Sequence, residues 1–572
     1  MKATKKIIRS LVVGCLLVCY CLQNLNAQIP PGVPLGGGGT NVYNPYPGFN
    51  PTPTFSYPTN ATLKWRLRMN HGPQYGFLSL SPDGFLYVPV ESTQVGGSYD
   101  LSLSLWSINV SLVDTNDADY PSPINFTNWI AADLANGPYS SQITPVIAND
   151  GAILTTDIGS YSLLYRGYLP ISAINPTNGS TIWSFYCRIG FTQLDISSQP
   201  VVGPDGTIYI STATFVYALT NAFGKTNFYS NTNIYARPLT NVWIKWLYQE
   251  DAFAGAYNFQ YSRPALSSDG TLYVNADNGR MYAFNSTNGT LKWVTTPPTN
   301  ANGATPTSPA IASDGTIFFG QGADLVAVDP KSSITNGKIP YKWVYFDPTI
   351  INGSGYLLGE FSLNPVIGTD GTVYSEISNL GGYTNKLVAL NPKTGLLKWS
   401  AYAGSGQNNS YAKFGSLAVA ADGEIFSAES DGSVYSFDPF GNTNWIYQTD
   451  SQVLGSPLIG PDGTLYVESL DGNIYAFCGS APIACSSWPE DGKNARRTSS
   501  VSLATSSLPT KNTNGFKFQI NGATNAPVCA CASSDLKTWT NIGQTILTGG
   551  KTNFVDIDAA NYPYRFYRAF PQ

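Results

Sequence analysis

Residues 264–294 read Pro-Ala-Leu-Ser-Ser-Asp-Gly-Thr-Leu-Tyr-Val-Asn-Ala-Asp-Asn-Gly-Arg-Met-Tyr-Ala-Phe-Asn-Ser-Thr-Asn-Gly-Thr-Leu-Lys-Trp-Val. Asp269-Gly270 and Asn278-Gly279 are dipeptides that favour tight hairpin turns, because Gly adopts positive φ without steric cost. The runs between the turns alternate in the manner of half-buried strands. The stretch therefore predicts a four-stranded antiparallel meander.

The same pattern recurs along the chain. The signature Asp-Gly-x-(Leu/Ile/Val)-(Tyr/Phe) begins at Asp83, Asp205, Asp269, Asp314, Asp370, Asp422 and Asp462, with a weaker copy at Asp150. The later strand of each unit is marked by Trp129, Trp183, Trp246, Trp293, Trp343, Trp399 and Trp445. Eight such units cannot each bury an apolar face alone, so they must pack on one another. Small sheets repeated radially form a β-propeller, here of eight blades.

The two ends of the repeat region are offset from each other. Trp65 precedes the first Asp-Gly, whereas the copy at Asp462 has no equally clear Trp strand after it. We therefore expect residues 61–66 to supply the fourth strand of the blade at 455–478, which closes the ring and leaves no open sheet edge. In the alternative, Ser487-Trp488 takes that place and 61–66 is an additional strand.

The repeat from Pro264 to Trp293 resembles that of the pyrroloquinoline-quinone (PQQ)-like propellers, also called quinoprotein alcohol dehydrogenase-like, over about residues 61–480. The resemblance implies eight blades. It also implies one of two kinds of protein, because the family includes quinoprotein dehydrogenases and the non-catalytic BamB-type scaffold of outer-membrane protein assembly. The tail, with Ala532–Trp539 and Arg565–Arg568, is similar to short C-terminal β modules on secreted bacterial proteins.

The expected fold class is all-β, and the chain divides into five parts. Residues 1–27 form a signal peptide, with basic residues before an apolar run at Leu11–Leu22 and cleavage after Ala27. An acylation site at Cys15 is the alternative. The other parts are a Pro/Gly-rich linker at 28–59, the propeller at 60–485, a linker at 486–512 and a small β-sandwich-like module at 513–572. The apolar run is too short to span a bilayer, so we expect a secreted or periplasmic protein without a membrane span.

Charge and composition limit the classes of molecule that this protein is expected to bind. The full chain has 31 basic and 36 acidic residues, and residues 1–27 contain four basic and no acidic side chains, so the rest carries a formal charge of −9. Without a basic stripe, nucleic acid is excluded as the expected partner. We expect a monomer that binds a protein or a glycan.

The catalytic members of the resembled family hold PQQ between a Trp and a disulfide of two adjacent cysteines, beside a calcium ion and an Asp base. This chain has no adjacent cysteines: beyond residue 27 they are Cys187, Cys478, Cys485, Cys529 and Cys531. A Cys478–Cys485 bond stays open, and Cys529 and Cys531 share one strand face, where direct bonding is awkward. We therefore assign no catalytic, cofactor-binding or metal residue and no cofactor. A non-enzymatic scaffold is predicted, and a PQQ-dependent oxidoreductase with a non-standard pocket is the alternative.

The residues give little support for histidine-based catalysis, calcium binding or polysaccharide cleavage. His71 is the only histidine. Asp114, Asp117 and Asp119 lack the central Gly of a calcium loop. Asp556 and Asp558 occupy alternate strand positions and are expected to face solvent. A polysaccharide-degrading propeller would require paired carboxylates that converge on a rim.

The loops between each fourth strand and the next blade are long and rich in Tyr. They include residues 249–261 with Arg263, Tyr356–Glu360 and Tyr411–Phe414. Loops on a rigid scaffold are common recognition surfaces. Two interpretations stay open: these residues bind a partner, or their Tyr side chains shield the blade ends.

Overall fold

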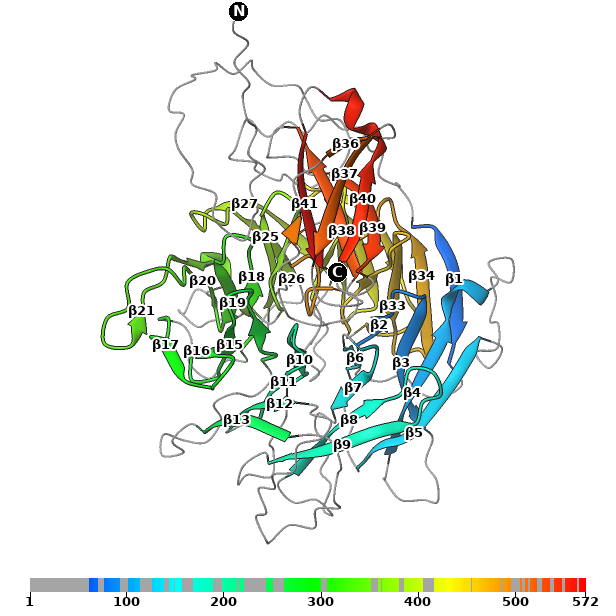
Figure 1. Ribbon diagram of the computed structural model, residues 1–572, viewed down its shortest axis with the longest axis horizontal. Helices are drawn as coiled ribbons and strands as arrows, with labels where there is room; N and C mark the ends of the chain where they lie inside the picture. Colours follow the sequence, from blue (N-terminus) through cyan, green and yellow to red (C-terminus); the bar gives the residue numbers. More distant parts are fainter. Residues whose placement is uncertain are drawn as a thin grey trace, which may run out of the picture.

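The computed structural model consists almost entirely of short strands arranged around a ring (Figure 1). It describes residues 61–69, 77–92, 101–113, 126–137, 144–148, 150–156, 168–188, 198–212, 215–220, 243–249, 262–299, 306–350, 359–361, 363–379, 385–404, 416–453, 455–484, 486, 488–494, 505–506, 510–512, 515–521, 527–534, 540–547, 551–562 and 565–571. Within these residues, no helix has both the length and the apolar character of a membrane span.

The ring is an eight-bladed β-propeller. Its first four sheets are β2 (Ser79–Leu80), β3 (Phe85–Ser92), β4 (Leu101–Asn109) and β5 (Thr127–Gly137); β6 (Val146–Ile147), β7 (Ile153–Thr156), β8 (Tyr168–Ile174) and β9 (Thr181–Arg188); β10 (Val201–Val202), β11 (Ile208–Ser211), β12 (Phe215–Thr220) and β13 (Trp243–Gln249); and β14 (Ala265–Leu266), β15 (Thr271–Asn275), β16 (Met281–Asn285) and β17 (Leu291–Thr295). We number these blades 1 to 4. A 3-10 helix, η1 (Val110–Leu112), follows β4.

Blades 5 to 8 complete the ring. They are β18 (Ala310–Ile311), β19 (Ile317–Gln321), β20 (Asp324–Val328) and β22 (Trp343–Phe346); β24 (Val366–Ile367), β25 (Val373–Asn379), β26 (Asn385–Leu390) and β27 (Leu397–Ala403); β28 (Ala418–Val419), β29 (Ile425–Ala428), β30 (Ser433–Phe437) and β31 (Thr443–Gln448); and β32 (Leu458–Ile459), β33 (Thr464–Glu468), β34 (Asn473–Cys478) and β1 (Leu63–Arg68). Blade 6 also carries β23 (Gly359–Phe361), and η3 (Pro348–Ile350) lies between β22 and β23. A parallel strand, β21 (Lys338–Ile339), extends the outer edge of blade 4.

The first strand of the chain closes the ring, as the sequence predicts. Strand β1 pairs antiparallel with β34, and Trp65 lies opposite Ala476. The backbone N–H of Cys478 donates to the carbonyl of Thr62 at the end of this ladder. The alternative, in which Ser487-Trp488 fills this place, is wrong. The closing blade therefore combines strands from the two ends of the repeat region.

One row of side chains explains why the motif repeats. In every blade the fourth-strand Trp lies opposite a buried Ala or Ser of the third strand, as Trp293 lies opposite Ala283. Ala283 also lies opposite Tyr273, the aromatic residue of the Asp-Gly motif. The Tyr273 and Trp293 rings lie 5.6 Å apart across it. A larger residue in the middle of the row would separate the two rings, so the small residue is required by packing.

The Asp-Gly dipeptides form the turns between the first and second strands. All eight of their glycines have φ between 76° and 92°. In seven of the eight turns, the Asp carboxylate accepts a hydrogen bond from the backbone N–H two residues later, as Asp269 does from Thr271 at 2.9 Å. The motif aspartates are therefore turn residues, as the sequence predicts.

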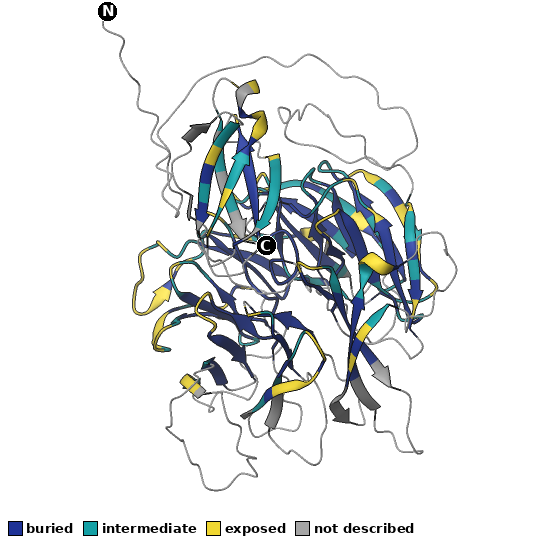
Figure 2. Cartoon of the chain, turned by 45° about the vertical axis from the view of Figure 1, so that its right-hand side comes forward, coloured by how far each residue is buried: buried dark blue, intermediate teal, exposed yellow. Residues whose placement is uncertain are grey.

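Neighbouring blades are joined by the same Trp residues. The Trp246 indole N–H donates to the carbonyl of Ser286 in the next blade at 2.7 Å, and its ring lies directly against Gly289. Trp129, Trp343 and Trp399 make the equivalent bonds to the next blade. Each of these four Trp residues therefore packs within its own sheet and bonds to a turn of the next blade. Figure 2 shows the buried residues concentrated along the inside of the ring.

The C-terminal residues form two small sheets. One contains β35 (Thr505–Ser506), β36 (Thr510–Asn512), β37 (Gly515–Asn521) and β40 (Lys551–Asp556), and the other contains β38 (Pro527–Ser533), β39 (Thr540–Ile546) and β41 (Phe566–Pro571). A 3-10 helix, η5 (Ile557–Asn561), follows β40. Phe518, Ile520, Val528 and Leu547 from the two sheets share a small core.

Candidate functional site

The antiparallel order of the strands gives the ring two different rims. The turn rim carries the eight Asp-Gly turns. The loop rim, on the opposite side, carries the connections from each fourth strand to the first strand of the next blade. The first strands line the central axis. Residues that immediately precede these strands therefore meet where the axis reaches the loop rim.

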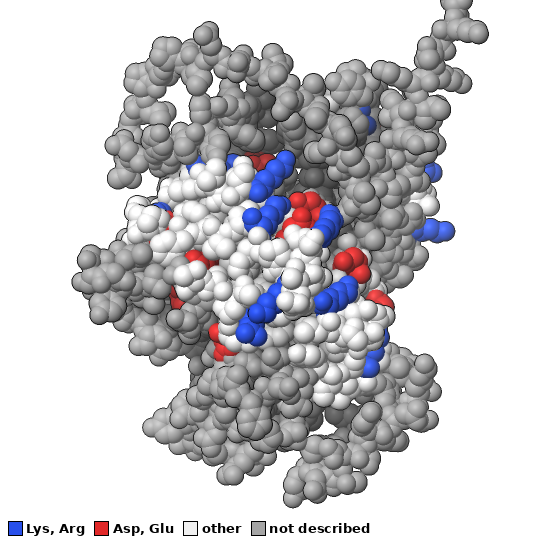
Figure 3. All heavy atoms as spheres, turned by 90° about the vertical axis from the view of Figure 1, so that its left-hand side faces the viewer, with Lys and Arg blue, Asp and Glu red and all other residues white. Residues whose placement is uncertain are grey.

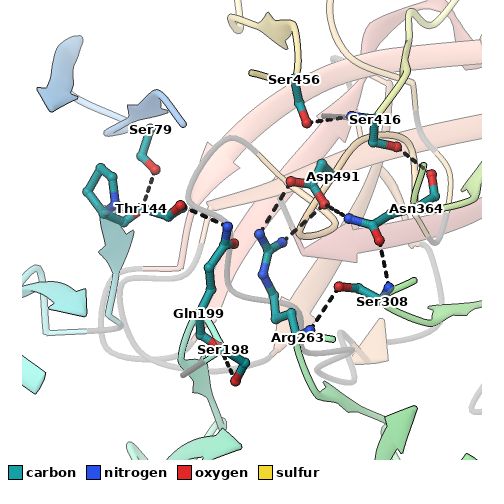
Figure 4. Close-up of polar contacts among 11 residues, drawn as sticks. Ser79, Thr144, Ser198, Gln199, Arg263, Ser308, Asn364, Ser416, Ser456 and Asp491 are labelled. Atoms are coloured by element: carbon teal, nitrogen blue, oxygen red, sulfur yellow. Dashed lines mark hydrogen bonds and ion pairs between the residues drawn. The ribbon is translucent and has the colours of Figure 1, made fainter. Parts of the chain in front are cut away.

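A girdle of hydrogen bonds links the blades at that end of the axis (Figure 4). Gln199 Nε2 donates to Thr144 Oγ1 at 2.8 Å, which joins blades 2 and 3. The backbone N–H groups of Arg263, Ser308 and Ser416 bond to side chains of the next blade, at 2.9, 2.6 and 2.7 Å. The remaining links join Ser79 to Pro145, Ser211 to Ser262, and Ser416 to Asn364. These bonds satisfy polar groups that the ring buries.

An ion pair lies within the girdle. Arg263 and Asp491 are 3% and 1% exposed, and two guanidinium N–H groups donate to the two carboxylate oxygens at 3.3 Å each. Asn364 Nδ2 also donates to Asp491, at 2.9 Å. The planar guanidinium suits this two-point contact. Arg263 was one of the residues expected to be available on the loop rim, and the structure instead buries it as a partner of Asp491.

Asp491 belongs to an axial strap, residues 480–494, that follows β34. Near the turn rim, Ser480 Oγ donates to Asp422 and Glu424 of blade 7. Ile483 and Glu490 pair with Ala420 and Ala418, in antiparallel bridges along the first strand of that blade. The strap therefore runs from the turn rim to the loop rim.

The middle of the strap spans two blades. The N–H of Ile367 in blade 6 donates to the carbonyl of Trp488 at 2.7 Å, and the N–H of Val419 in blade 7 donates to that of Pro489 at 2.9 Å. Trp488 is 3% exposed and packs into the apolar core of blades 4 to 6. The linker expected at 486–512 therefore begins with residues that pack inside the ring: Ser486 and all residues from Trp488 to Asn494 are buried.

A ladder of charge pairs follows the outside of the blades. The Lys before the fourth-strand Trp reaches back to the Asp-Gly turn, as in the pairs Lys64–Asp462, Lys245–Asp205 and Lys398–Asp370 at 2.9, 3.2 and 3.1 Å. Burial alone would raise the pKa of Asp462, but hydrogen bonds from Thr464 and Lys64 outweigh it and lower the pKa. On the face in Figure 3, basic and acidic side chains are interspersed. The described side chains of this face therefore do not form a patch of a single charge sign.

Blade 7 departs from this ladder. Glu424 occupies the place of the turn Thr, and Asn444 occupies the place of the Lys. Ser480 of the strap donates to Glu424 at 2.6 Å, and Ser436 donates to its other oxygen. Burial raises the pKa of Glu424 despite these bonds. The blade that the strap contacts most is thus the one that exchanges a surface ion pair for a hydrogen bond to the strap.

Paired carboxylates do occur, but inside the protein. Glu376 of blade 6 and Glu429 of blade 7 both accept from the hydroxyl of Ser427, and Asn385 Nδ2 donates to Glu429 at 2.8 Å. The two Glu residues are 1% and 0% exposed. Because a polysaccharide cannot reach them, this pair joins two blades and does not form the rim site that glycoside cleavage would need.

Two further carboxyl groups have shifted acidity. Burial raises the pKa of Glu468 well above its usual value, and its Oε2 has no hydrogen-bond partner among the residues that the structure describes. Burial also raises the pKa of Asp277 to about 7, although backbone N–H groups oppose the shift. Shifted carboxyl groups are found at catalytic sites. Among the described residues, however, no group of three or more His, Cys, Asp or Glu side chains could hold a metal ion.

The prediction that Asp556 faces solvent is wrong. It is 3% exposed, forms an ion pair with Arg565 at 3.1 Å, and accepts from the hydroxyl of Tyr567 at 3.0 Å. The reason is that β40 ends at this residue, whose side chain caps η5 by accepting from the N–H of Asp558. Asp558 is exposed, as expected.

The remaining candidate residues divide into two groups. Cys478 is an exposed free thiol, so the open Cys478–Cys485 bond is not formed. The sulfur atoms of Cys529 and Cys531, both buried in β38, lie 3.5 Å apart. Cys187 lies in β9, opposite Leu169 of β8. His71, the Asp114, Asp117 and Asp119 cluster, Tyr356 and residues 250–261 and 411–414 lie outside the described residues.

Sequence reasoning missed the girdle and the strap. The girdle residues Ser79, Ser416 and Ser456 are single polar residues before short apolar strands, and nothing in one copy of the repeat distinguishes them from loop residues. A signal for the strap did exist. Residues 479–494 contain a Trp and a Pro-bounded apolar stretch within a segment that otherwise resembles a linker.

A protein family matches more than half of the chain. The family described as outer membrane protein assembly factor BamB matches residues 169–338 and 359–507. BamB from Moraxella catarrhalis is a structural neighbour with 14% identity and a TM-score of 0.33, covering 73% of this chain and 99% of its own. The C-terminal WD40 domain of Sif2 has 11% identity and a TM-score of 0.44, covering 74% and 99%. No curated protein sequence matches this chain.

Proposed function

Because this chain belongs to the family of outer membrane protein assembly factor BamB, we propose that it is a non-catalytic scaffold, secreted or periplasmic, that binds a partner through its loop rim. The family is that of a factor for outer membrane protein assembly, which favours a protein as the partner. A glycan partner remains an outcome of the test. The apolar run near the N-terminus supports the proposed location.

The observation that carries this proposal is the filled axis. A ring of blades offers one natural place for a small cofactor, where all the first strands converge. The strap occupies this place over much of its length, with Trp488 buried against blades 4 to 6 and Asp491 bonded within the girdle. The polar groups of the girdle bond mainly to one another. The arrangement therefore supports a structural use of the axis.

Adding PQQ with calcium to the purified protein tests the alternative function. A ligand that binds only the native state raises the melting temperature, and a hundredfold excess over the dissociation constant stabilises by about 2.7 kcal/mol. We expect no shift at saturating quinone and no quinone-dependent reduction of a dye. A reproducible shift accompanied by dye reduction would show that the protein is an oxidoreductase.

Site-specific photo-cross-linking tests the proposed rim. A photoreactive residue would replace Tyr261, Tyr356 or Tyr411 in the loop-rim connections, and Thr287, in an exposed turn on the turn rim, serves as the matched control. We expect discrete adducts in cells from the loop-rim positions and none from Thr287. Protein and carbohydrate analysis of the adduct separates the two partner classes. Equal labelling from both rims would contradict the proposal.

A further inference from the structure

We propose that the axial strap and the closing strand β1 form a single interlock, in which the N-terminal strand fixes the start of the strap and the Arg263–Asp491 ion pair fixes its end. The strap would then hold the ring closed from within. This inference does not depend on the proposed function, because it concerns only contacts within the chain.

The start of the strap is tied to β1 through one residue. Cys478 is the last residue of β34, and its backbone N–H donates to the carbonyl of Thr62 at 2.9 Å. The strap begins two residues later, where Ser480 bonds to Asp422 and Glu424. The other blades take their fourth strand from the chain that follows their third strand. Blade 8 uses β1 as its fourth strand, and this leaves the chain after Cys478 available to enter the axis.

In this arrangement, blade 7 lacks a hydrogen bond that the Trp residues of four other blades make. Trp129, Trp246, Trp343 and Trp399 donate to a carbonyl in the turn that follows the third strand of the next blade. Trp445 faces blade 8, where the strap replaces that turn. Its indole N–H is buried and finds no acceptor among the described residues. The loss of one such bond indicates that the redirected chain makes compensating contacts elsewhere.

Those contacts lie at the far end of the strap. Removing one partner from a buried ion pair leaves a buried charge without its counter-ion, which is strongly destabilising. The Arg263–Asp491 pair joins the strap to blade 4, and the Asn364–Asp491 bond joins it to blade 6. The strap also bonds to blades 6, 7 and 8 through Ile367, Val419 and Ile459. One segment therefore contacts half of the blades in the ring.

Trypsin cleavage of the native full-length chain measures the docking of the strap. Lys493 is 2% exposed at the end of the strap, whereas Lys393 lies in an exposed turn. We expect mass spectrometry to detect cleavage after Lys393 while the bond after Lys493 stays intact. Cleavage at both sites at the same rate would show that the strap is not docked, and would overturn the proposal.

Asp491→Asn tests the far end of the interlock. When opening is fast relative to cleavage, the cleavage rate follows the open population, so the loss of this ion pair is expected to accelerate cleavage after Lys493 about a hundredfold. Asp558→Asn is the matched control, because Asp558 is an exposed carboxylate in η5. The proposal fails if trypsin cleaves after Lys493 at the same rate in the two variants.

Trp65→Ala tests the coupling between the two ends. Trp65 lies in β1, and Trp183 occupies the equivalent place in blade 2, outside the core that holds Trp488, so Trp183→Ala matches it for general destabilisation. An interlock predicts that Trp65→Ala accelerates cleavage after Lys493 at least tenfold more than Trp183→Ala does. Equal exposure would mean that the ends are independent. Leu67→Val, a smaller change in the same strand, replaces Trp65→Ala should that variant fail to fold.

Discussion

At the scale of single residues, the fold depends on what lies opposite each Trp. The recurring Trp of the fourth strand is visible in the sequence and predicts that strand; in the structure Ala283 lies between Tyr273 and Trp293, whose ring centroids are 5.6 Å apart. Asp556 could not be predicted in this way. Its burial depends on Arg565 and Tyr567, which reach it from β41 and the residue before it, and one copy of a motif carries no trace of such a contact.

The buried carboxyl group of Glu468 makes the folding stability of the protein depend on pH. Its pKa is raised well above 4.5 by burial, so the native state keeps a proton that the unfolded state releases as pH rises. Stability is therefore lost as pH increases from about 4.5 towards the folded pKa. We expect Glu468→Gln to remove this loss, because the amide cannot ionise. Its melting temperature should exceed that of the unmodified chain by an amount that grows with pH.

Melting curves between pH 4.5 and 8.5 provide the measurement for Glu468. Asp558→Asn is the control, since that carboxylate is exposed and its removal should leave the pH dependence unchanged. A difference between Glu468→Gln and the unmodified chain that stays constant with pH would contradict the prediction.

At the scale of elements, the blades interact through turns as well as through sheet faces. The Asp-Gly motif predicted the first turn of each blade correctly, because the requirement for positive φ is local. The role of the later Asn-Gly turn could not be read in the same way. Gly289 lies against Trp246 of the preceding blade, a contact between residues 43 positions apart that depends on how two blades stack.

Gly289→Ala and Gly206→Ala separate these two requirements. Both glycines have positive φ, 73° and 78°, so each substitution costs about 1 kcal/mol from backbone strain. A Cβ at residue 289 would also lie 2.6 Å from the Trp246 ring, whereas one at residue 206 meets nothing within 4 Å. We expect Gly289→Ala to cost about 1–3 kcal/mol more, as overpacking does.

Urea unfolding followed by Trp fluorescence measures that difference. The midpoint should fall further for Gly289→Ala than for Gly206→Ala, with a similar slope for both. Equal midpoints would show that the interface between the blades yields to the added methyl group.

At the scale of the whole molecule, the pairing of β1 with β34 closes the ring. Repeat counting predicted both the number of blades and the closing strand, because the offset of Trp65 from the first Asp-Gly is visible in the sequence. It did not predict what fills the ring. The sequence predicts a linker at residues 486–494, because a strap packed along an axis shows no periodicity of its own and its contacts come from four different blades.

Removing β1 should open the ring in a reversible way. A chain without residues 28–69 is expected to melt at a lower temperature and to recover stability when a peptide of residues 60–69 is added, with a shift that increases with peptide concentration. The same peptide with Trp65→Ala should be a poor substitute, because the indole fills the space opposite Ala476. Recovery by both peptides alike, or by neither, would contradict this role of β1.

The pairing of β1 with β34 also determines when β1 can fold during translation. Some 400 residues separate Arg68 from Asn473, and at roughly 5–20 residues per second a ribosome needs on the order of 20–80 s to make them. Trp65 and Leu67 emerge early and are buried only when their partner strand exists. A nascent chain of this protein therefore exposes an unpaired, apolar strand for most of its synthesis. This strand must be kept from aggregating until β34 has been made.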